Sequence, residues 1–317
     1  MSESVRPPSL PPPPSGQPPP PDPAESHRTV IAEDGTRLFV RQMPARNEET
    51  KIGISAVFCD GILCDGFIWK YLWSDVAEVC DVAHWHYRGH GRSGAPVDKQ
   101  RIDIEAHALD LKTVRDDLGD PPCVVIGHSM GTQVVLEGWR RYPKQVKGLI
   151  LVCGSFGKVT QSFRGVPILD MILPKLMDIV DQQPDIVRAI WSRIPPEVAL
   201  KAALLARDVD PSKVRREDML PYLKHMTHVD FPMFLRMLRA AGDHTAEDWL
   251  DEVDVPVLIV AGERDTFTPA SLSELMAERI PNAELLMVAG GSHVAPIEQP
   301  ELVGGRIRPF IERVSAA

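Results

Sequence analysis

Short apolar runs alternate with stretches of helical periodicity along most of this chain. The runs are four to eight residues long, which suits buried strands, whereas Leu111, Val114 and Leu118 lie on one helical stripe. Strands alternating with helices predict βαβ units and a mostly parallel sheet. The predicted strands are residues 52–58, 82–85, 123–126, 146–153, 257–261 and 285–288, and the predicted helices are residues 67–79, 104–118, 130–142 and 301–314.

The first 43 residues divide into a proline-rich tail and a predicted hairpin. Eleven of the 30 prolines fall within the first 23 residues, so we expect residues 1–26 to be a disordered, polyproline-type extension. Weak docking on an SH3-like partner is one interpretation of this tail, and a plain flexible extension is the preferred one. It lacks the apolar segment of a secretory signal. Residues 28–43 contain two strand-like runs around the turn residues 33–35, which predicts a hairpin.

A long segment in the second half of the chain breaks the alternation. Residues 156–249 contain no strand-like run, are rich in Met, Leu, Trp and Phe, and carry several prolines. We interpret residues 156–245 as a helical cap, inserted between two strands of a core made of residues 27–155 and 246–317. An insertion at the carboxyl ends of parallel strands would cover the crevice where open α/β sheets bind ligands.

Composition and charge exclude several classes of function. The chain has 317 residues, of which 44% are hydrophobic and 25% charged, as in a globular protein. A net charge of −9 argues against nucleic acid as a partner, since phosphate binding needs a basic surface. No run of about 18 apolar residues predicts a transmembrane helix. The five cysteines are an odd number and favour reduced thiols, so we expect a cytoplasmic protein. We also expect it to be a monomer or a small homo-oligomer.

The strongest chemical signal is the pentapeptide GHSMG at residues 127–131. It follows a predicted strand and opens a predicted helix, so Ser129 lies on a sharp strand-to-helix turn that exposes its hydroxyl group. Only small residues tolerate the crowded backbone two positions to either side. The Met130 amide at the helix start can donate to a developing oxyanion. These features predict a nucleophilic serine.

A serine nucleophile needs a base and an acid that orients the base. Asp265 follows the predicted strand 257–261, and His293 follows the predicted strand 285–288. Serine, acid and histidine therefore occur in the order expected after successive strands of such a sheet. Glu263 is the rival acid, but it lies nearer the strand and is expected to point elsewhere.

A second oxyanion donor is expected in the loop after the predicted strand 52–58. Gly61 lets the backbone turn tightly there, which leaves the Ile62 amide free to face the amide of Met130. Because the donors are backbone amides, substituting the side chain of Ile62 would test this prediction poorly.

Several further motifs resemble those of one family. They are YRGHGRS at residues 87–93, Asp65-Gly66 with Trp69, GERD at residues 262–265 with Thr268-Pro269, and GSH at residues 291–293. With the GHSMG motif they resemble α/β-hydrolase-fold proteins of the lidded esterase and perhydrolase type, over about residues 28–317. The resemblance implies an eight-stranded, mostly parallel sheet flanked by helices, with an inserted helical cap. It also implies Ser129 as nucleophile, Asp265 as acid, His293 as base, and the amides of Ile62 and Met130 as oxyanion donors.

Some residues depart from the family pattern or allow another interpretation. Asp60 and His86 stand where the family usually has histidine and aspartate, which leaves the charge near the site and the anchoring of its loops open. His84 and His86 together could form a metal pair, but without an evident third ligand structural histidines are preferred. Cys59 and Cys64 flank the predicted oxyanion loop and are interpreted as buried and inert. A serine at the elbow excludes relatives that use an aspartate nucleophile.

The predicted function is hydrolysis of a neutral, apolar ester or lactone through an acyl-enzyme, without a metal or an organic cofactor. Phe156, Trp191, Phe231 and Phe234 are the candidates for substrate contact, with ordinary helix packing as the alternative. Perhydrolysis ranks lower because Leu63 stands where such relatives often carry proline. Cleavage of a carbon–carbon bond would need a polar pocket. Outside enzymes, the alternative is a non-catalytic ligand-binding protein of the same fold.

Overall fold

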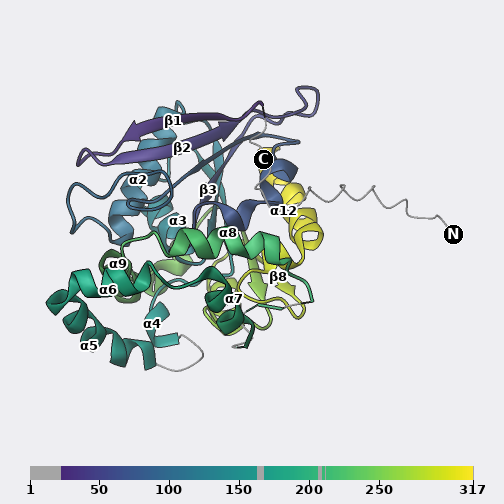
Figure 1. Ribbon diagram of the computed structural model, residues 1–317. Helices are drawn as coiled ribbons and strands as arrows, with labels where there is room; N and C mark the ends of the chain where they lie inside the picture. The colour runs from purple at the N-terminus through teal and green to yellow at the C-terminus, as the bar shows by residue number, and fades with distance from the viewer. Residues whose placement is uncertain (1–22, 163–167, 206–208, 211, 317) are drawn as a thin grey trace.

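One eight-stranded sheet organises the molecule (Figure 1). The computed structural model describes residues 23–162, 168–205, 209–210 and 212–316. The strand order is β1-β2-β4-β3-β5-β6-β7-β8, and all neighbours are parallel except that β2 is antiparallel to β1 and β4. The predicted mostly parallel sheet and the N-terminal hairpin are thus confirmed. The strands are β1 Ser26–Ile31, β2 Arg37–Met43, β3 Ser55–Cys59, β4 Asp81–Trp85, β5 Cys123–His128, β6 Val146–Val152, β7 Val257–Gly262 and β8 Ala283–Val288.

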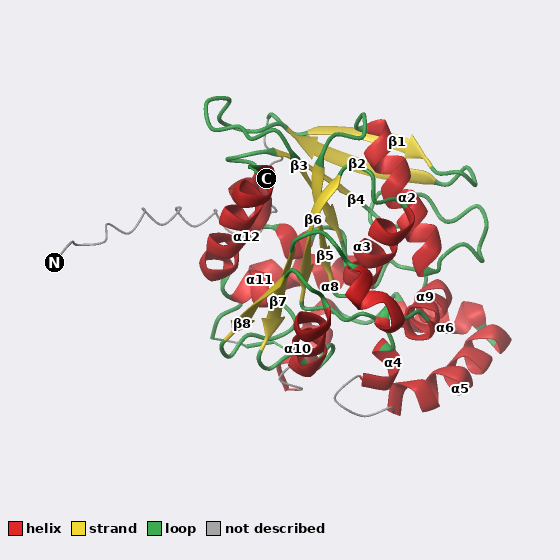
Figure 2. Cartoon of the chain, turned by 180° about the vertical axis from the view of Figure 1, so that it is seen from behind, coloured by secondary structure: helices red, strands yellow, loops and turns green. Residues whose placement is uncertain are grey.

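Helices cover both faces of the sheet, with α12 on one side and α2 and α3 on the other (Figure 2). Successive residues of a strand point to opposite faces, so the central strands are apolar at every position. Val125 and Leu149 belong to the core under α2 and α3, whereas Val124 and Ile150 belong to the core under α12. The helices of this part are η1 Phe67–Trp69, α1 Leu72–Val76, α2 Ile104–Asp117, α3 Met130–Arg141, α10 Ala270–Arg279, α11 Ala295–Glu298 and α12 Pro300–Ser315.

One predicted helix is wrong. Residues 67–79 do not form a continuous helix but the short η1 and α1. Tertiary contacts override the local helical pattern here, because the Trp69 indole N–H is bonded to Asp60, and the hydroxyl group of Tyr71 to Asp218. The helices α10 and α11 have no counterpart among the predicted elements.

The segment between β6 and β7, which we call the helical insertion (residues 156–245), contains helices joined by short loops and no strand in the residues that the structure describes. Its two ends are joined by an isolated antiparallel bridge between Gly157 and Thr245. Asp230 caps α9 by accepting a hydrogen bond from the Met233 amide at 3.0 Å. The helices are α4 Val159–Ser162, α5 Ile168–Gln182, α6 Pro184–Trp191, α7 Pro196–Leu205, α8 Arg216–Met226 and α9 Phe231–Asp243, and η3 Glu247–Glu252 follows them.

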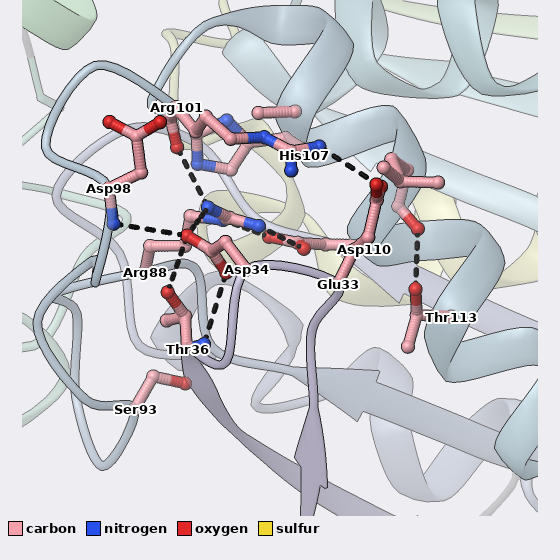
Figure 3. Close-up of polar contacts among 12 residues, drawn as sticks. Glu33, Asp34, Thr36, Arg88, Ser93, Asp98, Arg101, His107, Asp110 and Thr113 are labelled. Carbon is pink, nitrogen blue, oxygen red and sulfur yellow. Dashed lines mark hydrogen bonds and ion pairs between the residues drawn. The ribbon is translucent and has the colours of Figure 1, made fainter.

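A buried ion-pair network ties the hairpin to α2 (Figure 3). The guanidinium group of Arg88 is fully buried and donates to both carboxylate oxygens of Asp110, at 2.6 and 2.7 Å. It also donates to Asp34 in the hairpin turn at 2.8 Å. Bidentate contacts of this kind are strong and directional. The network fixes the start of the loop after β4 against two other elements.

We expect Asp110→Asn to lower the free energy of unfolding by about 3 kcal/mol, because it leaves the buried Arg88 charge without its main counterion. Asp34 remains bonded to Arg88 and should keep the loss at the lower end of the usual range. Urea denaturation measures it. Asp116→Asn in the exposed Lys112–Asp116 pair of the same helix is the matched control, and should cost less than about 1 kcal/mol. Equal losses in both variants would contradict the prediction.

No helix in the described part of the chain is both long enough and apolar enough to span a membrane. The five cysteines are all buried, and none forms a disulfide.

Candidate functional site

Ser129 lies at the turn between β5 and α3 in a strained backbone conformation, with φ 55° and ψ −120°. A positive φ is uncommon for a residue with a side chain. The elbow closes only because its flanking residues are glycines. A Cβ atom on Gly127 would lie 2.3 Å from the carbonyl oxygen of Gly131, and one on Gly131 would lie 2.5 Å from that of Cys59. The turn thus packs directly on the end of β3.

Gly131→Ala should therefore separate the elbow from β3. Because the obstacle is backbone, we expect a loss of about 1–3 kcal/mol in unfolding free energy. The predicted ester hydrolysis should slow as well, since the adjacent Met130 amide moves. Gly305→Ala in α12 is the control, because nothing lies within 4 Å of its added Cβ, and it should raise stability slightly. Thermal melting and ester turnover of both variants check this, and a fully active, stable Gly131→Ala protein would refute it.

The structure brings Ser129, His293 and Asp265 together from three separate loops. The Ser129 hydroxyl oxygen lies 3.0 Å from His293 Nε2, and His293 Nδ1 lies 2.8 Å from Asp265 Oδ2. The other oxygen of Asp265 accepts the amides of Phe267 and Thr268, at 2.8 and 2.9 Å. These two bonds leave only one oxygen of Asp265 facing the imidazole, so the carboxylate has a single orientation. Glu263 instead accepts the Gly290 amide at 2.7 Å and points elsewhere, as expected.

Two buried side chains hold the loop that carries His293. The Glu298 carboxylate accepts the amide and the hydroxyl group of Ser292, both at 2.7 Å. The imidazole of His128 lies 2.9 Å from the backbone carbonyl oxygen of His293 and donates to it through Nε2. Burial lowers the pKa of His128 to about 3, so this ring is neutral. Sequence reasoning missed both roles, because each depends on contacts between distant parts of the chain.

The two predicted amide donors border Ser129. A Cβ atom on Gly61 would lie 3.0 Å from Ser129 Cβ, so the loop after β3 passes directly beside the nucleophile. Among the described residues, neither the Ile62 nor the Met130 amide donates a hydrogen bond. Unpaired amides next to a candidate nucleophile are what an oxyanion requires.

Two histidines shape the loops beside these amides, and both must be neutral to do so. His90 accepts the Leu63 amide on Nε2 at 3.2 Å, and burial lowers the pKa of His90 to about 4. Leu63 itself has a positive φ of 64°, so this bond holds a strained residue. His86 accepts the Arg92 amide on Nδ1 at 2.8 Å, and burial holds its pKa well below the usual value. His86 thus anchors the loop after β4, where the family usually has an aspartate.

The carboxylate of Asp60 lies directly behind the candidate donor loop and is fully buried. It accepts the indole N–H of Trp69 at 2.9 Å and the imidazole N–H of His84 at 2.8 Å. Burial raises the pKa of Asp60 to about 7, opposed by the Arg41 charge and by the Trp69 hydrogen bond. His84 is therefore engaged by a carboxylate. No group of three or more His, Cys, Asp or Glu side chains in the described ranges could hold a metal ion.

The helical insertion packs on the segment that follows the donor loop. Asp218 of α8 bonds the side chains of Lys70 and Tyr71, and Tyr222 stacks on Phe67 with ring centroids 3.9 Å apart. Met233 of α9 lies against Gly89. The insertion thus contacts the loops after β3 and β4, near the candidate amides.

Three of the four predicted substrate contacts form one aromatic cluster within the insertion. Trp191 lies 4.5 Å from Phe231 and 6.2 Å from Phe234, measured between ring centroids. The cluster joins α6 to α9, which is the packing role that was the alternative interpretation. Phe234 also packs against the core cluster that contains Met130 and Phe156. The Phe156 side chain is buried, and the backbone carbonyl oxygen of Phe156 accepts a hydrogen bond from the Ala246 amide, beside the bridge that closes the insertion.

Phe267 lies at the site, although the sequence analysis did not single it out. Its ring centroid is 4.9 Å from that of His293, and 36% of the residue is exposed. An aromatic ring at this exposed position can contact a substrate acyl or alcohol group. Its place two residues after Asp265 was the only available signal.

Comparison with known proteins identifies the fold and the family of this chain. The model of a protein family described as serine aminopeptidase, S33, matches residues 76–300. A pimeloyl-[acyl-carrier protein] methyl ester esterase from Neisseria meningitidis is 28% identical over 227 residues, covering 71% of this chain and 66% of that protein. An esterase from Exiguobacterium antarcticum has a TM-score of 0.71 at 19% identity, covering 90% of this chain and 98% of that one. The enol-lactonase from Burkholderia xenovorans has a TM-score of 0.69 at 18% identity, covering 90% of this chain and all of that one. The fold is that of the α/β hydrolases.

Proposed function

The chain belongs to the serine aminopeptidase, S33, family of α/β hydrolases, and on that basis we propose that it cleaves carboxylic esters through an acyl-enzyme on Ser129. The observation that carries the proposal is the hydrogen-bonded series from the Ser129 hydroxyl group through His293 to Asp265, at 3.0 and 2.8 Å. A serine hydroxyl group becomes a nucleophile only beside such a base.

In the proposed reaction His293 takes the hydroxyl proton on Nε2 as Ser129 Oγ attacks the ester carbonyl carbon. Asp265 stabilises the resulting imidazolium and keeps its Nδ1–H in place. The negative charge on the carbonyl oxygen is stabilised by the amides of Ile62 and Met130. Collapse of this intermediate expels the alcohol, which receives the proton from His293. A water molecule, deprotonated by the same histidine, then attacks the acyl-enzyme and releases the acid.

The apolar residues that carry and adjoin the candidate amides support a neutral, apolar substrate. Ile62 and Phe234 are only partly buried and pack against the apolar cluster that includes Met130 and Met233. Apolar and flexible methionine side chains suit acyl chains of varied shape. The alternatives on the same residues are lactone opening, perhydrolysis and carbon–carbon bond cleavage, and lactone opening differs only in retaining the alcohol within the product.

The test is hydrolysis of p-nitrophenyl esters from acetate to palmitate, with γ-lactones and aminoacyl p-nitroanilides as further substrates. We expect ester turnover with an optimum that measures the acyl space, and slower or no cleavage of the anilides. An alkyl fluorophosphonate should label one residue, Ser129, identified by peptide mass spectrometry. Anilide cleavage faster than ester cleavage would replace the esterase by an aminopeptidase. Absence of both turnover and labelling would leave a ligand-binding protein.

A further inference from the structure

Two of the unusual residues near the site, Asp60 and His84, contact each other. Asp60 directly follows β3 and precedes Gly61 and Ile62, and its carboxylate is wholly buried. One oxygen accepts the Trp69 indole N–H and the other contacts His84 Nε2. The side chain therefore binds one group on each oxygen beneath the loop of residues 60–66.

The hydrogen bonds of this group have one direction. The Nε–H of Arg41 donates to His84 Nδ1 at 3.1 Å, and a guanidinium group can only donate. His84 Nδ1 is therefore the unprotonated nitrogen, and the ring donates its Nε2–H to Asp60. Burial keeps the pKa of His84 well below its ordinary value, which agrees with a neutral ring. Arg41 supplies a positive charge at one end of this series of hydrogen bonds, and Asp60 supplies a carboxylate at the other end.

The backbone of Asp60 is held from the opposite side by the nucleophile elbow. Its carbonyl oxygen would lie 2.6 Å from a Cβ atom on Gly131, so the backbone at Asp60 and the backbone at Gly131 are in direct contact. Ile62, the second residue after Asp60, carries a candidate oxyanion amide. With the backbone packed on the elbow and the side chain tied to β2 and β4, the direction of the Ile62 amide depends on the Asp60 side chain.

We propose that Arg41, His84 and Asp60 are positioning residues that orient the Ile62 amide toward the oxyanion through a hydrogen-bond chain of fixed direction. We call these three residues the oxyanion-loop anchor. Their role rests on the proposed function, because only an acyl-transfer reaction uses that amide. Glu25 and Asp65 also interact electrostatically with Arg41, and the Arg41 guanidinium lies 4.2 Å from the Trp73 ring. The anchor thus joins the hairpin strand β2 to the candidate site.

The test first interrupts the series of hydrogen bonds with one substitution and then reverses the donors and acceptors with a second. In Asp60→Asn, the amide oxygen can still accept the Trp69 N–H, but its NH2 group faces the Nε2–H of His84. Moving the histidine proton to Nδ1 only transfers the conflict to the Arg41 N–H. We expect kcat for the best ester to fall about 10- to 100-fold, less than the loss of a whole oxyanion donor, with KM changed less than about threefold.

Arg41→Gln added to Asp60→Asn should restore turnover. The introduced glutamine oxygen occupies the same place along the side chain as Arg41 Nε, so it can accept a proton from His84 Nδ1. The introduced asparagine NH2 group then donates to His84 Nε2, and the whole chain is satisfied in the opposite direction. We expect kcat of the double variant to recover to within about fivefold of wild type, although each substitution alone removes a native contact. Simple loss of packing would instead make the double variant the worst of the three.

One readout, the position of the His84 proton, does not need ester turnover and so separates this proposal from the proposed function. Nitrogen-15 NMR of the histidine rings, with His84→Gln to assign the signals, should show His84 protonated on Nε2 in wild type and on Nδ1 in the double variant. Asp34→Asn is the matched control, because the Asp34 carboxylate, in the hairpin turn, also accepts hydrogen bonds on both oxygens, from Thr36, Arg88 and the Asp98 amide. It should keep kcat.

Wild-type kcat in Asp60→Asn, a double variant no better than Asp60→Asn, or an unchanged His84 proton position would overturn the anchor. A wild-type protein without ester turnover would overturn the proposed function, while the NMR result still decides whether the hydrogen-bond chain has the stated direction.

Discussion

Ser129→Ala is expected to lower kcat for p-nitrophenyl esters by about 10⁴- to 10⁶-fold, with the fold intact. The substitution removes only the hydroxyl oxygen, which lies 3.0 Å from His293 Nε2, so no acyl-enzyme can form. The remaining amides and histidine can assist direct attack by water only weakly. Steady-state assays at high enzyme concentration, with the released p-nitrophenol followed for hours, measure this residual rate.

Ser273→Ala is the control for this result, because Ser273 is also a buried serine but lies on α10, outside the site. It should retain wild-type turnover and stay unlabelled by a fluorophosphonate. A Ser129→Ala protein that keeps more than about one hundredth of wild-type kcat would show that another residue is the nucleophile.

Asp265→Asn should lower kcat by about 10⁴-fold. The amide oxygen will occupy the position that accepts the Phe267 and Thr268 amides, because the NH2 group cannot accept them. The NH2 group then faces His293 Nδ1 and donates to it. This places the histidine proton on Nε2, toward Ser129, where it prevents the ring from taking the hydroxyl proton.

The control is Glu263→Gln, two residues earlier in the same loop. Its carboxylate bonds only the Gly290 amide among the described residues, and a glutamine oxygen can replace it. We expect turnover within about threefold of wild type, whereas a larger loss than in Asp265→Asn would make Glu263 the acid instead. Because the size of the Asp265→Asn effect depends on the direction of one amide group, Asp265→Ala, which leaves His293 free to rotate, should be tested beside it.

The local signals in the sequence were sufficient for the strands and for the order of the site residues. The central predicted strands, 123–126 and 257–261, are apolar runs buried on both faces, so their composition indicates their position directly. The elbow was equally readable, since glycine at positions 127 and 131 is imposed by backbone contacts that no side chain can relieve. His293 and Asp265 follow strands β8 and β7, and parallel strands end at one edge of the sheet.

Contacts between distant residues decided the rest. Nothing local distinguishes Glu298 from an exposed glutamate, and only the folded chain places it against Ser292. The aromatic residues of the insertion were identified by type, but their partners depend on how α6 packs against α9.

Asp60 and His84 show the same division most clearly. In the sequence they are 24 positions apart, Asp60 as an acid where the family usually has histidine, and His84 as one member of a possible metal pair with His86. The parallel pairing of β3 and β4 sets Phe58 beside His84 and so brings the two side chains together. The sequence by itself determined which chemical groups this protein has and where its strands and elbow lie along the chain, because those depend on neighbouring residues. Which groups share a hydrogen bond, and therefore which are charged, neutral or free to react, was decided only by the tertiary structure, because burial and partnership are properties of residues that lie far apart along the chain.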